Sequence, residues 1–340
     1  MSGFTDIINA VVLLLNFVFM PALSYGSQLA LGALAVTLVY AVLRFANFAQ
    51  GDTMAFSTVA TILMTWLLQK LGITLGFMPT ALLALPFAVI ACLIYVLLVD
   101  KFVYNYYRKQ NSKPITIVMA SVGVMFVTGG LVRFILGPEH HIFADGARFI
   151  MTAREFKAMT GLSEGLAIKT SQFLTITIAI LLVGFVFYFL QKTKTGKAMR
   201  AYADNKDLAL LSGIDPDKVV RVTWMLVAVL TTIAGVLYGL DKGFMANSYH
   251  QLLLPVFAAV IVGGIGSPMG AIVGGFVISF SEMILTYAYK KFLIYLLPEV
   301  LQPDSLAQFL GTEYKVAISF VILVIVLLLR PTGIFKGKVI

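Results

Sequence analysis

Long uncharged apolar runs constrain this chain more than any other feature of its sequence. Residues 7–43, 71–99 and 243–281 contain no Asp, Glu, Lys or Arg. A helix of about 20 apolar residues crosses the hydrocarbon core of a bilayer, where only structures that pair their own backbone polar groups are stable. Charged residues make up 12% of the chain, against about a quarter of a soluble domain. We therefore predict an all-α fold in which residues 1–340 form one polytopic membrane domain.

The positions of the runs predict ten crossings, within a range of eight to ten membrane segments. Residues 7–43 are too long for one span. Polar and helix-breaking residues at 21–28 lie near the middle of that run, so we predict two helices, 7–23 and 27–43. Glycines and a proline interrupt the last run, which predicts a hairpin of two short membrane helices. The other predicted spans are 53–69, one within 71–99, 115–135, 171–190, 222–240 and 314–329.

Basic residues set the predicted orientation. Residues 192–221 hold seven Lys or Arg and four Asp, and a net-positive loop of this kind faces the cytoplasm. Residues 101–113 are also basic and rich in tyrosine, which is typical of the inner interface. Parity then places residues 136–170 and 288–313 outside and both termini inside. Inside segments hold 15 Lys or Arg against 10 outside. The C-terminal tail contributes Arg330, Lys336 and Lys338.

The inside loop at 192–221 is expected to be ordered. Thr195 is predicted to cap a helix that continues through Ala198, Ala201 and Leu208 to Leu211. Gly213 suits the left-handed position after a helix end. Asp215 and Pro216 then suit the N-cap and first residue of the next span, with Ile214 and Val219 as a hydrophobic staple. A rigid helix between two spans is suited to receive force from a soluble partner.

Two sequence features are candidates for a translocation path. The first is the polar break with Asn47, Gln50 and Asp52, since a carboxylate at membrane depth must face protein or water. The alternative is a short cytoplasmic turn in which Asp52 caps the next helix. The second feature is the glycine cluster at 262–275, which permits either unwound backbone beside a cavity or tight helix packing.

Other chemistry is weakly represented. Glu139, His140, His141 and Asp145 are either a metal site or a solvated loop, and His250 stands alone. The single cysteine, Cys92, excludes an internal disulfide and a cysteine-based metal site. The sequence contains no phosphate-binding loop and no nucleophile–base arrangement, and the N-terminal run lacks the basic start of a cleavable signal peptide. The net charge of +9 follows from the inside loops, so nucleic acid is not implied.

Five segments, in this order, resemble the permease subunits of branched-chain amino acid ABC importers. They are LVYAVLRFANFAQGD (38–52), TGKAMRAYADNKDLALLSGIDPDKVVRVTW (195–224), AGVLYGL (234–240), VFAAVIVGGIGSPMGAIVGG (256–275) and LRPTGIF (329–335). The resemblance implies that the second segment docks on an ATP-binding subunit. It also implies a bacterial inner membrane, a periplasmic substrate-binding protein and a second permease chain, identical or related. The family commonly shows NFAHGD where this chain has Gln50, which removes a titratable group.

We therefore expect a non-enzymatic permease subunit of an ATP-driven importer, which moves branched-chain or related amino acids by alternating access. The partner subunits are expected to use ATP and Mg²⁺, and this chain is expected to bind no cofactor and no metal. A urea or sugar permease of the same fold family, or a self-sufficient channel or secondary carrier, is the alternative. The expected path residues are Asn47, Gln50, Asp52, Gly263, Gly264, Gly266 and Ser267. The expected ATPase contacts are Gly196, Lys197, Arg200, Asp204, Leu208 and Gly213.

Overall fold

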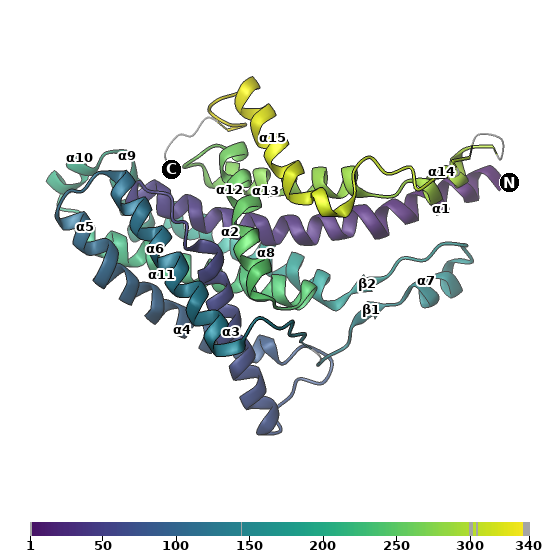
Figure 1. Ribbon diagram of the computed structural model, residues 1–340, viewed down its shortest axis with the longest axis horizontal. Helices are drawn as coiled ribbons and strands as arrows, with labels where there is room; N and C mark the ends of the chain where they lie inside the picture. Colours follow the sequence, from purple (N-terminus) through teal and green to yellow (C-terminus); the bar gives the residue numbers. More distant parts are fainter. Residues whose placement is uncertain (1, 144, 299–301, 304, 336–340) are drawn as a thin grey trace.

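The computed structural model describes residues 2–143, 145–298, 302–303 and 305–335, so Lys336 and Lys338 lie outside the described residues. Within these ranges, nine helices are long and apolar enough to cross a membrane, which confirms a polytopic helical fold (Figure 1). The spanning elements are α1–η1–α2 (Ser2–Leu14, Leu15–Phe19, Met20–Leu43), α3 (Gln50–Lys70), α4–η2–α5 (Ala81–Val99, Asp100–Tyr104, Asn105–Lys109), α6 (Pro114–Leu136), α8 (Thr170–Lys192), α11 (Pro216–Lys242), α12 (Ala246–Gly263), α13 (Pro268–Thr286) and η4–α15 (Thr312–Tyr314, Lys315–Leu329).

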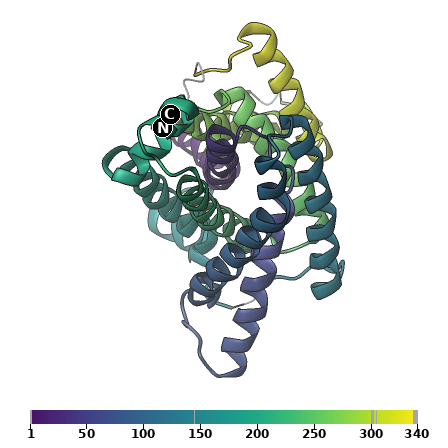
Figure 2. The ribbon, with the colours of Figure 1, turned by 90° about the vertical axis from the view of Figure 1, so that its left-hand side faces the viewer.

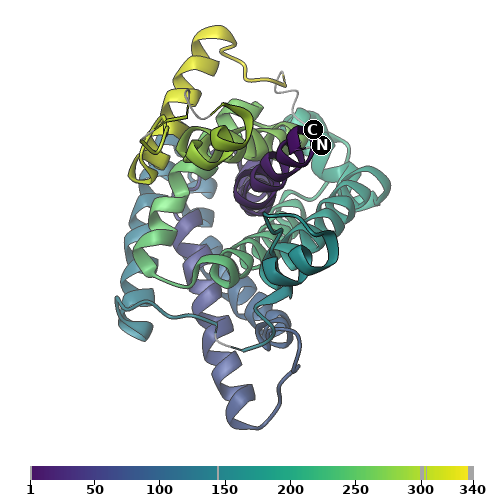
Figure 3. The ribbon, with the colours of Figure 1, turned by 90° about the vertical axis from the view of Figure 1, so that its right-hand side faces the viewer.

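Shorter elements connect the spans. They are β1 (Phe149–Met151), α7 (Ala153–Thr160), β2 (Ile168–Lys169), α9 (Lys194–Asp204), α10 (Lys206–Leu211) and α14 (Lys290–Leu296). Figure 1 shows α9 and α10 at one end of the long axis and the N-terminus at the other. Figure 2 views the molecule from the end that carries α9 and α10, and Figure 3 views it from the end where α1 begins.

The prediction of two helices within 7–43 was wrong, because the chain forms one continuous helix from α1 to α2. Pro21 lies in the first turn of α2, directly after the π-helical turn η1. The wider π turn accommodates a residue that has no N–H and would clash with the carbonyl of an α-helical turn. The helix spans 42 residues, or about 63 Å, roughly twice the thickness of a hydrocarbon core. It counts as one span, so the predicted ten crossings become nine.

The small and polar residues in the middle of this helix serve packing rather than a turn. Ser24, Ser27 and Gln28 are buried, and the Gln28 amide donates a hydrogen bond to the Leu237 carbonyl on α11 (3.4 Å). A methyl group at Gly275 of α13 would lie 2.8 Å from the backbone nitrogen of Ala30. The approach at Gly275 lets α2 pack closely against α13, and α2 also packs against α11 at the centre of the bundle.

The predicted hairpin of 243–281 is confirmed as α12 and α13. Gly264 and Gly266 have φ values of 111° and 87°, which favour glycine, and the Ser267 hydroxyl caps α13 by accepting from the Gly270 N–H (3.1 Å). A methyl group at Gly263 would collide with the Gly270 carbonyl, so the cluster brings the two helix backbones together. The C-terminal segment crosses this turn, where the Phe335 N–H donates to the Gly263 carbonyl (3.0 Å).

The first half of the long helix carries structure that the sequence did not predict. Residues 149–169 form the antiparallel pair β1–β2 and the helix α7. Asn9 and Asn16 of the long helix accept hydrogen bonds from the backbone of Glu164 and Ala167 (both 3.1 Å). Helix α14 also packs against α1 (Figures 1 and 3). Residues 149–169 and helix α14 therefore gather around the N-terminal end of the chain.

The predicted helix of the 192–221 loop is divided into two. Thr193, not Thr195, caps α9, because its hydroxyl accepts from the Gly196 N–H (2.9 Å). Asn205 then adopts an extended backbone and caps α10 by accepting from the Leu208 N–H (3.0 Å). The expected cap of α11 is confirmed, since Asp215 accepts from the backbone N–H of Asp217 (2.9 Å).

Candidate functional site

The polar break at 44–52 enters the helix bundle instead of turning at its surface. Helix α2 ends at Leu43, and Arg44 adopts a left-handed backbone with φ of 59°. Helix α3 begins at Gln50, whose amide donates to the Thr231 hydroxyl of α11 (2.7 Å). Thr231 lies 15 residues beyond Pro216, or about 22 Å along a helix about 40 Å long. The alternative of a short surface turn is therefore excluded for Gln50.

Asn47, Gln50 and Asp52 are all buried, with 4%, 1% and 2% of their surfaces exposed. The side-chain amide oxygen of Asn47 accepts a hydrogen bond from the Tyr104 hydroxyl (3.1 Å). The Tyr104 ring stacks on Trp224, with 5.6 Å between the ring centroids. These contacts pin the irregular segment between η2 and α11. Gln50 thus ties the start of α3 to the middle of α11, and Asn47 holds unwound backbone against the last third of the α4–η2–α5 span. Such an arrangement is tolerated at membrane depth only inside protein or beside water.

Asp52 has a partner that could not be expected from the sequence. The Nδ1 atom of His250 on α12 lies 3.1 Å from the Asp52 carboxylate, so this histidine does not stand alone. Gly129 admits the same carboxylate to α6, since a methyl group there would lie 2.8 Å from Asp52 Oδ1. A carboxylate and an imidazole therefore meet among α3, α6 and α12. We define Asn47, Gln50, Asp52 and His250 as the central polar site.

The glycine turn does not belong to the central polar site. Helix α12 approaches Gly51 at Tyr249 and Leu253. Gly263 follows Leu253 by ten residues, or about 15 Å along the helix. Gly263, Gly264, Gly266 and Ser267 instead hold the α12–α13 turn and the C-terminal segment. A role of these four residues in a path stays a prediction.

The expected ATPase contacts fall into two groups at the α9–α10 tip. Lys197, Asp204, Leu208 and Gly213 are exposed, and Arg200 is half-buried. Gly196 is buried against the end of α8, where a methyl group would lie 2.7 Å from the Leu190 Cα. Gly196 therefore positions α9 and is not accessible to a partner.

Two further residues at this tip were not among the expected contacts. Leu211 is 86% exposed and, with Leu208 at 62%, gives α10 an apolar surface. The Arg44 guanidinium donates a hydrogen bond to the Ala203 carbonyl of α9. Arg44 precedes the buried segment by a few residues, so α9 is joined directly to the chain that leads into the central polar site.

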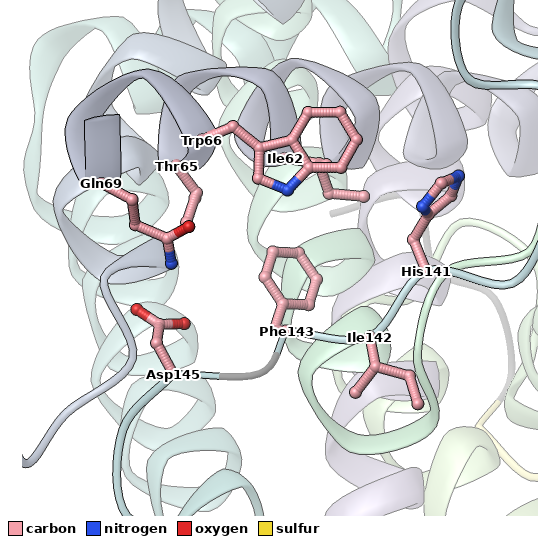
Figure 4. Close-up of a pocket in the computed structure, with 8 residues that line it drawn as sticks. All are labelled: Ile62, Thr65, Trp66, Gln69, His141, Ile142, Phe143 and Asp145. Atoms are coloured by element: carbon pink, nitrogen blue, oxygen red, sulfur yellow. The ribbon is translucent and has the colours of Figure 1, made fainter.

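A small cavity lies between the far half of α3 and residues 141–143 and 145, which include one histidine of the suspected metal site (Figure 4). His141 contacts the Trp66 ring at 5.7 Å between centroids, and the Asp145 carboxylate accepts from the Thr80 N–H (2.7 Å). His140 lies 3.2 Å from the Lys242 carbonyl. Within the described ranges no three His, Cys, Asp or Glu side chains are placed to hold a metal ion. The histidines instead attach this segment to the ends of the spans.

Comparisons with known proteins find relatives along most of the chain. The family model described as "Branched-chain amino acid transport system / permease component" matches residues 19–327. The high-affinity branched-chain amino acid transport system permease protein LivH of Escherichia coli K12 is 28% identical, over 91% of each chain. The probable branched-chain amino acid transport permease protein LivH of Methanocaldococcus jannaschii is 27% identical, over 92% of this chain and 90% of that protein.

One solved structure, PsaBC from Streptococcus pneumoniae in complex with Fab, covers 94% of this chain and 92% of that chain, with 14% identity and a TM-score of 0.47. A likeness of that size supports no argument. The family match covers most of the chain and includes the central polar site, the α9–α10 tip, all seven spanning elements from α3 to α13, and most of α15. The chain therefore belongs to the family of branched-chain amino acid transport system permease components.

Proposed function

We propose that this chain is the membrane-spanning permease subunit of an ATP-driven importer, which moves branched-chain or related amino acids across the inner membrane by alternating access. Its partners would be ATP-binding subunits, a periplasmic substrate-binding protein and a second permease chain, identical or related. ATP and Mg²⁺ would be used by the partner subunits, and this chain would bind no cofactor. The curated relatives are named as permeases for branched-chain amino acids, which supports this substrate class.

One observation carries the proposal: the hydrogen bond from Arg44 to Ala203 joins the exposed α9–α10 tip to the central polar site. The apolar surface of Leu208 and Leu211 stands among charged neighbours, and it is suited to insert into a soluble partner. Movement of α9 would pull on Arg44 and therefore on the segment that holds Asn47 and Gln50. A partner can shift the equilibrium between two permease states only if it binds them differently, and this connection supplies such a difference.

The proposed orientation places α9 and α10 in the cytoplasm. Because residues 2–43 form one helix, the N-terminus then lies outside and the C-terminus inside. This assignment changes the expected side of the N-terminus alone. It leaves the excess of basic residues in the connecting segments on the inside, as the positive-inside rule favours. It also puts β1–β2, α7 and α14 outside, where a delivering protein would dock.

The test is reconstitution of the chain in liposomes with its ATP-binding partners and binding protein, followed by ATP-dependent uptake of leucine. R44M should abolish most uptake and substrate-stimulated ATP hydrolysis while the ATP-binding subunits still co-purify. K70Q, at the other end of α3, is the matched control and should retain uptake. Uptake by this chain without ATP-binding partners would instead identify a channel or secondary carrier. Normal coupling in R44M would exclude the Arg44 connection.

A further inference from the structure

A cavity of about 300 Å³ lies at the end of the bundle away from α9 and α10, among α2, α11, α12, α13 and α15. Its wall carries opposite charges on different helices. Glu282 of α13 supplies a carboxylate, while Lys242, at the end of α11, and Lys315, at the start of α15, supply ammonium groups. The central polar site does not include any of these residues.

Glu282 is the unusual member of this group. It is 2% exposed, and it accepts a hydrogen bond from the Ser319 hydroxyl. Across the described part of the chain it forms no ion pair with either lysine, and Lys242 is paired with Asp241 at 3.3 Å instead. A buried carboxylate without a cation is costly, and in spanning helices such groups mark binding or transport sites. A ligand ammonium would supply the missing partner.

The rest of the lining suits the remainder of such a ligand. The two lysines offer ammonium groups that can bind a carboxylate. Leu252, Met283 and Val316 provide an apolar part of the wall. The cavity lies at the small end of the range for ligand sites, about 300–1,000 Å³. A small molecule with adjacent ammonium and carboxylate groups and an aliphatic side chain satisfies all three parts of the wall.

We propose that this cavity is an entry site that selects the zwitterionic form of an aliphatic amino acid, with Glu282 receiving its ammonium and Lys315 and Lys242 its carboxylate. An amine without a carboxylate would be repelled by the lysines, and an acid without an ammonium would be repelled by Glu282. An uncharged solute would leave Glu282 unpaired. The inference rests on the proposed function, because it names where that function's substrate is first held.

The experiment uses the full chain with S248C, because Ser248 lines the cavity and the native Cys92 is buried. The rate at which a thiol reagent labels position 248 is measured with L-leucine, with isopentylamine, which lacks the carboxylate, and with 4-methylpentanoate, which lacks the ammonium. Leucine should slow labelling in a saturable way, and neither analogue should do so at the same concentration. If either analogue protects position 248 as well as leucine does, the proposal is refuted by this experiment alone.

Variants then assign the groups. E282Q should weaken protection by leucine about 30-fold or more, the lower end for removing one partner of a buried charge pair. The matched control is E313Q, because Glu313 is an exposed acid just before α15. In this variant leucine should protect position 248 as well as it does in the parent. If exposure of Cys92 shows that E282Q does not fold, K315Q is used in its place. K315Q should weaken the protection of position 248 by leucine, but leucine should still protect better than isopentylamine. Unchanged protection in the folded variant would overturn the assignment.

Three further outcomes distinguish an amino acid from a lipid ligand, and the proposed site from the proposed function. A phosphatidylethanolamine headgroup also joins an ammonium to an anion, so the assay is repeated on lipid-depleted protein with and without this lipid. Protection by the lipid that leucine does not compete with would overturn the amino acid site. If the complete importer takes up leucine but leucine does not protect position 248, the proposed site is refuted and the proposed function is retained. Protection without uptake by the importer would support the site and refute the function.

Discussion

Gly196 gives the sharpest test of how α9 is held, because its close contact is with backbone that cannot move aside. In G196A the new methyl group would lie 2.7 Å from the Leu190 Cα and nearer still to the Phe189 carbonyl oxygen. Ordinary contacts begin at 3.4 Å, so α9 must move by at least 0.7 Å (3.4 − 2.7) from α8. Overpacking of this kind costs about 1–3 kcal/mol. The matched control is G184A on α8, where nothing lies within 4 Å of the added methyl group.

Both substitutions replace a helical glycine, so both gain about 0.5–1 kcal/mol from helix propensity. Their difference in free energy of unfolding therefore isolates the clash, and we expect G196A to be less stable than G184A by about 1–3 kcal/mol. Buried Cys92 provides the assay, because denaturation in detergent exposes its thiol to a fluorogenic reagent. G196A should also lose ATP-coupled uptake, since α9 is displaced. Equal stability of the two variants would refute the close packing of α9 on α8.

Three other predictions follow. Charge reversal in K197E/R200E should cut substrate-stimulated ATP hydrolysis and spare membrane insertion, and normal stimulation would exclude docking at α9. Replacing the central amide in Q50L should lower stability by about 0.6–1.7 kcal/mol, the range for hydrogen bonds between membrane helices, but should abolish leucine uptake. Retained uptake would remove Gln50 from the path. A thiol introduced by I7C, at a residue 51% exposed, should react with an impermeant reagent from outside the cell, and labelling only from inside would contradict a single first span.

The sequence predicts spans well where charged residues bound an apolar run. Helices α6, α8 and α15 begin and end within two residues of their predicted limits. Asp215 and Pro216 also fixed the start of α11, because capping is a local interaction. The prediction failed at Pro21, where a π turn absorbs the proline and distant helices bury the polar residues that followed it. Tertiary packing overrode a local turn signal there.

The candidate site was predictable only in part. The sequence shows that Asn47, Gln50 and Asp52 stand between apolar segments. Their depth in the bundle depends on the hydrogen bond from Gln50 to Thr231, 181 residues away. The Asp52–His250 contact joins residues 198 apart. An isolated histidine carries no sign of such a partner. The glycines at 263–270 were equally consistent with packing and with a path, because glycine permits both.

Helix α11 connects the regions that transport would need to coordinate. It begins at the Asp215 cap beside α10, receives the Gln50 amide at Thr231, and ends at Lys242 in the cavity wall. Between Thr231 and Lys242, the Gly235 carbonyl accepts a hydrogen bond from the Tyr249 hydroxyl of α12 (2.8 Å), so the helix that carries His250 also contacts α11. A tilt of α11 driven from its capped end would therefore act at once on the central polar site and on the spacing of Lys242 from Glu282. Coupling through a rigid helix requires that the state of each site changes the tilt that α11 favours. The accessibility of position 248, measured with and without ligand, reports such a change of tilt.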